Sequence, residues 1–199
     1  MIKMLITVLL SINLFSIVFG QCLQKNNFST RSYEIGEIVS IEHQLMEFDV
    51  CYGNYEEGVF KIADFNHNLN GGNYKVSMIR INATWWPPCY ASIGVFDDII
   101  ETWQGDNRVA LVNNVDDLGQ PWSCEQWGES HEVENPIIID GQSCLDCGNN
   151  YPIFNWFGYA YTDYVFIDHN MKVYYLHNGI SSYLANTIIQ EMLDAIPSF

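Results

Sequence analysis

Cysteine supplies the most reactive side chains of this chain, and six cysteines are present. They are Cys22, Cys51, Cys89, Cys124, Cys144 and Cys147. A cysteine thiolate attacks disulfides, and two cysteines form a structural disulfide where the compartment is oxidising. Six cysteines allow fifteen complete pairings, and the sequence alone does not choose among them. Which chemistry applies therefore depends on the elements that position each sulfur.

Cys89 stands where a β-type run changes into a helical pattern. Residues 74–82 are mostly apolar, as in a buried strand, and apolar residues recur every three or four positions over 89–103. The start of a helix favours the thiolate form of a cysteine, because the helix macrodipole is positive there. A buried free thiol or half of a structural disulfide is the plainer interpretation of Cys89.

Cys124 has a comparable setting. It lies in a short helical segment predicted at 121–127, after a strand predicted at 108–115. Turns that follow parallel strands gather at one edge of a sheet, so Cys124 and Cys89 are expected at the same edge. A Cys89–Cys124 bridge is therefore a reasonable prediction, either as a structural or as a redox-switchable disulfide.

Cys144 and Cys147 form a CxxC pair after a strand predicted at 135–140. Such a pair fits a redox-active dithiol, but it also fits a plain disulfide that closes its loop. A zinc site would need a second pair of ligands at a suitable spacing, and none is evident. Cys22 and Cys51 flank the N-terminal section, and a disulfide between them is the simplest expectation.

The elements around these sulfurs alternate between strand and helix. Strands are predicted at 37–50, 59–65, 74–82, 108–115, 135–140, 163–168 and 172–176, and helices at 89–103, 121–127, 151–157 and 182–196. This order predicts an α/β fold with a central mixed sheet, flanked by helices and closed by a hairpin. An N-terminal β section precedes the alternating part.

The first twenty residues predict a signal peptide, residues 1–20. Lys3 precedes a mostly apolar run, and positions 18 and 20 are small enough for cleavage before Gln21. No later apolar run is as long, so we expect a secreted or secretory-lumen protein without stable membrane insertion after cleavage. Asn27 and Asn82 match the N-glycosylation acceptor pattern.

The chain is strongly acidic. It has 24 Asp and Glu against 8 Lys and Arg, which gives a formal net charge of −16. Such a charge repels nucleic acid and anionic membranes, so a nucleic-acid-binding function is excluded. The histidines show no metal-binding spacing and no phosphate-binding glycine loop is present, so neither a metal nor a cofactor is expected.

Residues 83–89, Ala-Thr-Trp-Trp-Pro-Pro-Cys, resemble the Ala-Thr-Trp-Cys-Pro-Pro-Cys redox loop of thioredoxin-like proteins. The order of strands and helices over residues 60–197 is similar to that of the redoxin branch of this superfamily. That branch contains thiol–disulfide reductases and alkyl hydroperoxide reductases. The resemblance implies a thioredoxin-like domain at 59–199 behind an N-terminal extension at 21–58.

The resemblance also implies an active-site loop with two departures. The loop consists of Trp85, Trp86, Pro87 and Pro88, with Cys89 in the place of the resolving thiol. Trp86 replaces the attacking cysteine of the family, and an indole forms neither a thiolate nor a mixed disulfide. Thr162 takes the place of the proline that faces the loop in the family. The peroxidase pattern is not met either, because Thr84 lies five residues before Cys89 instead of three.

Three functional hypotheses follow. The first is an atypical thiol–disulfide oxidoreductase, acting on a thiol- or disulfide-bearing protein through Cys89 with Cys124, or through Cys144 with Cys147. The second is a redox-inactive binding or structural module in which all six cysteines form disulfides. The third concerns Trp86, because a recoded stop codon at this position would mean that the true residue is selenocysteine or another residue.

Overall fold

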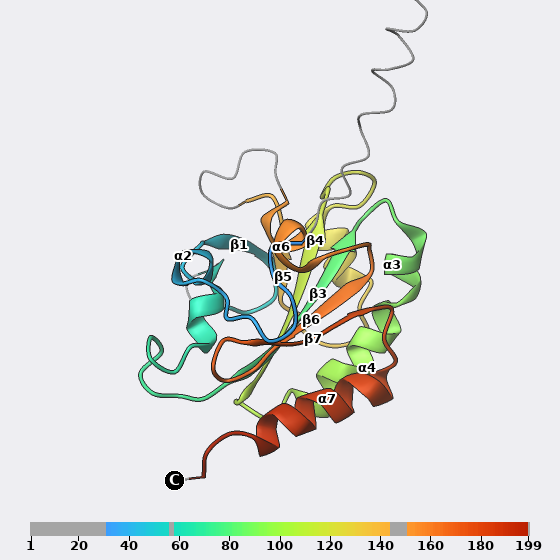
Figure 1. Ribbon diagram of the computed structural model, residues 1–199. Helices are drawn as coiled ribbons and strands as arrows, with labels where there is room; N and C mark the ends of the chain where they lie inside the picture. The colour runs from blue at the N-terminus through green and yellow to red at the C-terminus, as the bar shows by residue number, and fades with distance from the viewer. Residues whose placement is uncertain (1–30, 56–57, 144–150, 199) are drawn as a thin grey trace, which may run out of the picture. The chain divides into compact units, whose positions relative to one another are not determined.

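The computed structural model describes residues 31–55, 58–143 and 151–198 (Figure 1). The predicted signal peptide and the predicted glycosylation site at Asn27 lie outside the described residues. So do Cys22 and the CxxC pair of Cys144 and Cys147.

Seven strands form one mixed sheet in the order β2-β1-β5-β4-β3-β6-β7. They are β1 (Phe48–Tyr52), β2 (Val59–Phe60), β3 (Val76–Ala83), β4 (Val109–Asp116), β5 (Ile138–Asp140), β6 (Asp163–Ile167) and β7 (Val173–Asn178). β3, β4 and β5 are parallel, and the outer strands join antiparallel. All eight residues of β3 are buried, as expected for a central strand with both faces covered.

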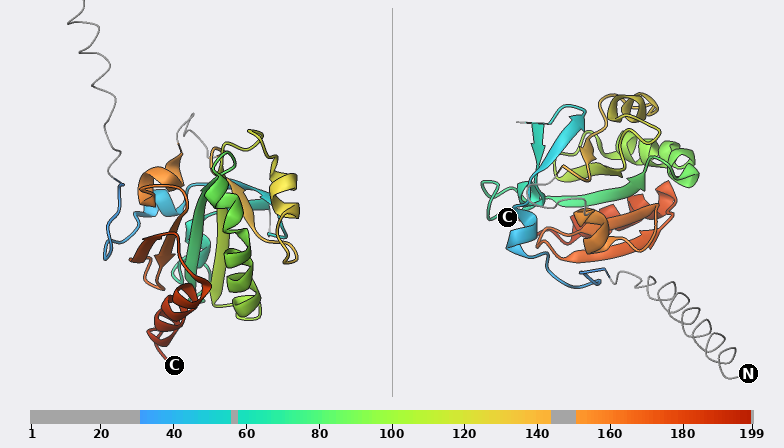
Figure 2. Two further views of the ribbon diagram at one scale, coloured as in Figure 1. Left: turned by 90° about the vertical axis from the view of Figure 1, so that its right-hand side faces the viewer. Right: turned by 90° about the horizontal axis from the view of Figure 1, so that it is seen from above.

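Helices cover both faces of this sheet (Figure 2). They are α2 (Ile41–Gln44), the 3-10 helix η2 (Ile62–Phe65), α3 (Pro87–Ala91), α4 (Ile93–Trp103), α5 (Cys124–Glu129), α6 (Pro152–Phe157) and α7 (Ser182–Asp194). α4 and α7 contact each other and pack on one face through side chains such as Phe96 and Ile189. Trp156 and Phe157 of α6 pack on the other face. Burial of each such side chain stabilises the fold by about 1.5–3 kcal/mol.

The predicted α/β architecture is confirmed. The N-terminal β section is built into the same sheet, because β1 pairs with β5 on one side and with β2 on the other. The alternating strands and helices follow in the predicted order, and the closing hairpin is formed by β6 and β7.

Three predicted elements were wrong in detail. The strand predicted at 37–50 is interrupted by α2, because the Ser40 side chain accepts a hydrogen bond from the His43 backbone and caps a helical turn. The strand predicted at 59–65 ends at Phe60 and continues as η2. The helix predicted at 89–103 breaks at Ser92, which separates α3 from α4.

Candidate functional site at the redox loop

Residues 83–89, which we call the redox loop after the resemblance, lie at the carboxyl ends of β3 and β4. Ala83 and Asp116 are partners in the last register position of these two parallel strands. Thr84 then fastens the loop to the end of β4, since its backbone N–H donates to the Asp116 carbonyl. The Thr84 hydroxyl lies 2.6 Å from the carbonyl oxygen of Asp117, to which it donates. The position of the loop is thus set by the strand pair below it.

Trp85 and Trp86 are presented to solvent. Their side chains are 49% and 40% exposed. The Trp85 indole N–H donates to the Asp117 carboxylate over 2.6 Å, and its ring meets the edge of Tyr161 at 5.6 Å between centroids. Trp86 is the N-cap residue of α3, and the two prolines occupy the first two helical positions. An exposed indole therefore stands directly before α3, three residues ahead of Cys89.

Cys89 lies directly behind this loop in the protein interior. Its side chain is 0% exposed, and it is the free cysteine among the described residues. Its Sγ lies 3.5 Å from the Thr162 hydroxyl. Burial raises the pKa of the Cys89 thiol, against smaller lowering effects of the Thr162 hydrogen bond and the Arg80 charge. Cys89 is therefore a neutral, shielded thiol near pH 7.

Thr162 faces Cys89 from the turn before β6. The Tyr161–Thr162 peptide bond is cis, and the Thr162 side chain is buried. The position that the resemblance gave to a proline thus lies opposite the redox loop, with a hydroxyl directed at the sulfur.

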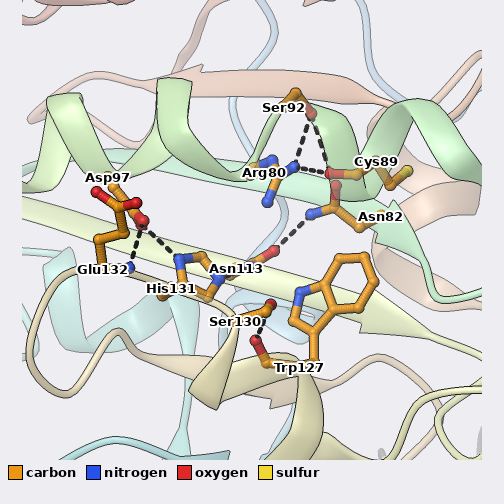
Figure 3. Close-up of polar contacts among 10 residues, drawn as sticks. All are labelled: Arg80, Asn82, Cys89, Ser92, Asp97, Asn113, Trp127, Ser130, His131 and Glu132. Carbon is orange, nitrogen blue, oxygen red and sulfur yellow. Dashed lines mark hydrogen bonds and ion pairs between the residues drawn. The ribbon is translucent and has the colours of Figure 1, made fainter.

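A buried arginine supports the helical side of the loop (Figure 3). Arg80, in the middle of β3, is fully buried and donates from Nη2 to the Cys89 carbonyl at 2.5 Å and to the Ser92 hydroxyl at 2.7 Å. Its guanidinium carbon lies 5.5 Å from the centre of the Phe96 ring. Ser92 also donates to the Cys89 carbonyl. The Cys89 carbonyl thus accepts hydrogen bonds from side chains in place of a backbone N–H of a continuing helix, which explains the break between α3 and α4.

A second buried network runs beside the first (Figure 3). His131 Nδ1 lies 2.5 Å from the Asp97 carboxylate, and Nε2 lies 3.2 Å from the amide of Asn113. The Asn113 side chain in turn accepts a hydrogen bond from the Asn82 amide. Sequence reasoning missed Arg80 and this network. A lone charged residue inside a mostly apolar strand was the one available signal.

The acceptor pattern at Asn82 is not presented by the folded domain. Asn82 is 0% exposed, in the interior of β3, and its amide nitrogen is the donor to Asn113. A glycan on that nitrogen would have to displace this pair from the core. Burial of this side chain argues against a glycan at Asn82 in the folded domain, and the glycosylation itself stays a prediction.

The described cysteines pair differently from the prediction. Cys51 of β1 is bonded to Cys124 at the start of α5, with 6.1 Å between their Cα atoms. The predicted bridges Cys22–Cys51 and Cys89–Cys124 were therefore wrong. The reason is the place of β1, which lies next to β5 in the sheet, so that α5 packs against it.

Two adjacent acids hold the aromatic side chains around the loop. Asp116 is fully buried and accepts a hydrogen bond from the Tyr161 hydroxyl at 2.9 Å. Burial raises the pKa of Asp116 to about 7, and the nearby charges of Asp117 and Asp140 act in the same direction. Asp117 accepts from the Tyr151 hydroxyl at 2.7 Å, besides the indole of Trp85. Sequence reasoning missed this pair, although two acids directly after a buried strand could have drawn attention.

Over 31–55, 58–143 and 151–198, no three His, Cys, Asp or Glu side chains are grouped closely enough to hold a metal ion. Within that part of the chain, no helix has the length and apolar character required to span a bilayer.

Comparison with solved structures identifies the fold. MTB dsbF, in mixed oxidised and reduced forms, matches with a TM-score of 0.57 and 13% identity, covering 77% of this chain and 98% of that chain. A secreted Mycobacterium tuberculosis disulfide oxidoreductase homologous to E. coli DsbE matches at 0.55 with 9% identity, over 76% and 99% of the two chains. The exposed lipoprotein thioredoxin of Streptococcus pneumoniae matches at 0.53 with 16% identity, over 73% and 97%. No family model and no curated protein matches the sequence. The chain thus has a thioredoxin-like fold.

Proposed function

We propose that the protein is a secreted thioredoxin-fold module that binds other polypeptides at its redox-loop edge without exchanging thiols there. One observation carries the proposal: the loop exposes Trp86, while Cys89 is buried, neutral and without a thiol partner among the described cysteines. Disulfide exchange needs an accessible thiolate and a second sulfur. Among the residues that the structure describes, neither requirement is met at this edge, because Cys89 is buried and Cys124 is already bonded to Cys51.

Binding is supported by the aromatic surface around the loop. Trp85, Trp86 and Tyr90 are exposed, and Tyr90 stacks on Trp122 with 5.4 Å between ring centroids. Large, rigid aromatic side chains dominate the energy of protein interfaces, because they bury much area at little entropic cost. The hydrogen bond to Asp117 fixes the orientation of the Trp85 ring in advance. The resemblance to thiol–disulfide oxidoreductases suggests a cysteine-bearing protein as the partner.

The test is an insulin-reduction assay on the full chain with dithiothreitol as the reductant. We expect the wild-type rate to equal the rate without enzyme. A parallel binding measurement with reduced, unfolded insulin B chain is expected to weaken by about tenfold or more on Trp85→Ala, which removes one interfacial aromatic side chain. Tyr183→Ala, at an exposed aromatic residue of α7, is the matched control and should not change binding.

A second candidate function remains an atypical oxidoreductase that uses Cys144 and Cys147. The CxxC spacing favours it. Insulin reduction by the wild type that is lost in Cys144→Ser and kept in Cys89→Ser would establish this function and contradict the binding module.

Secretion and the identity of residue 86 have tests of their own. Secretion is supported by the predicted signal peptide, and the secreted chain is expected to begin at Gln21 on N-terminal sequencing. The codon at position 86 decides whether Trp86 is encoded as tryptophan. An ordinary tryptophan codon ends the recoding hypothesis, whereas a reassigned stop codon would call for the residue itself to be determined by mass spectrometry.

A further inference from the structure

The amino half of β4 has an open edge. β3 pairs with all of β4, whereas β5 pairs only with its residues 113–115. The Asn113 N–H donates to the Ile137 carbonyl on the β5 side. Successive residues of a parallel strand direct their polar groups to alternate neighbours, so Leu111 also directs its N–H and C=O to this side. No strand among the described residues pairs with Leu111 there.

Two hollows flank this edge. The larger, of about 600 Å³, lies between β4 and the segment that contains β2 and η2. The smaller, of about 300 Å³, lies between β4 and α4, against Trp103. Four residues line both hollows, namely Lys75, Val109, Leu111 and Ile137. The hollows therefore meet along the open edge.

The two hollows belong to opposite faces of the sheet. Ala110 and Val112 pack with the cluster on the α6 side, whereas Val109 and Leu111 pack with the cluster beneath α4 and α7. Side chains of an extended chain also alternate between the two faces of a sheet. A strand placed beside Leu111 would direct alternate side chains into one hollow and then the other.

A lysine without an ion pair among the described residues lies beside the open edge. Lys61 and Lys75 both line the larger hollow, and Lys61 is already paired with Glu47 over 2.8 Å. Lys75 forms no ion pair with any residue that the structure describes. Asp64 lines the hollow as well, but its carboxylate already accepts from the Tyr55 hydroxyl and the Lys61 backbone. An acidic side chain placed beside Lys75 would therefore gain an ion pair at this edge.

We propose that the open edge of β4 binds an extended, acidic and apolar segment of a partner protein as an added strand. The backbone of the segment pairs with Leu111, an acidic side chain lies near Lys75, and its apolar side chains lie against Trp103. Strand addition obtains affinity from main-chain hydrogen bonds and specificity from the alternate side-chain hollows. This edge is at the opposite end of β4 from the redox loop, so the inference does not depend on the function proposed above.

The test uses the full chain, labelled with ¹⁵N, and a blocked peptide of four Val-Glu repeats. We expect the amide signal of Leu111 to shift and to exchange more slowly with solvent when the peptide is added. Two control peptides are compared with it. One carries N-methyl groups on alternate residues and so lacks half of the backbone N–H donors. The other consists of four Val-Lys repeats. Both are expected to bind more weakly.

The variant Lys75→Glu tests the charge. It should weaken binding of the Val-Glu peptide by about two- to fivefold, the range for an exposed ion pair, and should improve binding of the Val-Lys peptide. An unchanged Leu111 signal at millimolar peptide would overturn the proposal. So would equal binding of the N-methylated peptide, an unchanged preference in Lys75→Glu, or shifts confined to Trp85 and Thr162.

Discussion

The substitution Trp86→Cys is predicted to restore disulfide exchange to the redox loop. Residue 86 is the N-cap of α3 and Cys89 is the third helical residue, with the Cys89 N–H donating to the Trp86 carbonyl at 2.9 Å. A thiol at position 86 would complete a CxxC pair across the first helical turn. It would inherit an exposed position, since Trp86 is 40% exposed, while Cys89 stays shielded as the resolving thiol.

The size of the effect follows from the thiolate fraction. An ordinary thiol has a pKa of about 8.5 and is only about 3% ionised at pH 7, whereas CxxC motifs lower the pKa of the first cysteine to about 7 in thioredoxin-type sites. The introduced thiol would then be about half ionised, a gain of roughly fifteenfold over an ordinary thiol. The wild type has tryptophan at this position, so its rate of insulin reduction should equal the background, whereas the rate of Trp86→Cys should be measurably higher.

Insulin reduction by dithiothreitol is the assay, with Trp86→Ser as the matched control. Trp86→Cys should accelerate reduction, and Trp86→Ser should stay at background. The double variant Trp86→Cys with Cys89→Ser should accumulate a mixed disulfide with insulin, since the resolving thiol is removed. A folded Trp86→Cys variant that stays at background, or a wild type that is equally active, would refute the reasoning.

Three other predictions concern stability. The double variant Cys51→Ser/Cys124→Ser removes a disulfide between residues 73 positions apart. It should lower the free energy of unfolding, measured by urea titration, by about 4 kcal/mol. A loss below about 1 kcal/mol would speak against a formed disulfide. Asp116 has a folded-state pKa of about 7, above its unfolded value, so the folded state binds the proton more tightly. Stability should fall as pH rises from about 4 to about 7, and Asp116→Asn should flatten that slope in urea midpoints; an unchanged slope would contradict the assignment. Gly128→Ala should destabilise by about 1–3 kcal/mol, because its Cβ would lie 2.4 Å from the ring of Tyr52; an unchanged midpoint would contradict this packing.

The sequence predicted the part of the fold that depends on local patterns. The period of the apolar residues located β3, α4, β4 and α7, and the loop before Cys89 located the junction between β3 and α3. The two prolines before Cys89 belong to α3, so the helix begins at Pro87, two residues earlier than predicted. Such features depend on neighbours within one or two turns of the chain, which is the range over which periodicity carries information.

The rest depends on contacts between distant segments. The bond between Cys51 and Cys124 requires β1 to enter the sheet beside β5, and no local pattern encodes that order. The roles of Arg80 and Asp116 likewise arise from groups that the fold brings to them, Ser92 in one case and Tyr161 in the other. The site at residues 83–89 therefore stays a prediction from a local motif, while the expected disulfide partners of Cys51 and Cys124 were wrong.

The thiol of Cys89 behind the redox loop is shielded and neutral, and we expect it to be unreactive. The most direct test is the extent of Cys89 alkylation by iodoacetamide at pH 7, followed by mass spectrometry of the native and the unfolded full chain. Burial and the raised pKa of Cys89 predict negligible modification in the native protein and complete modification after unfolding in urea. Prompt and complete alkylation of Cys89 in the native protein would contradict the account.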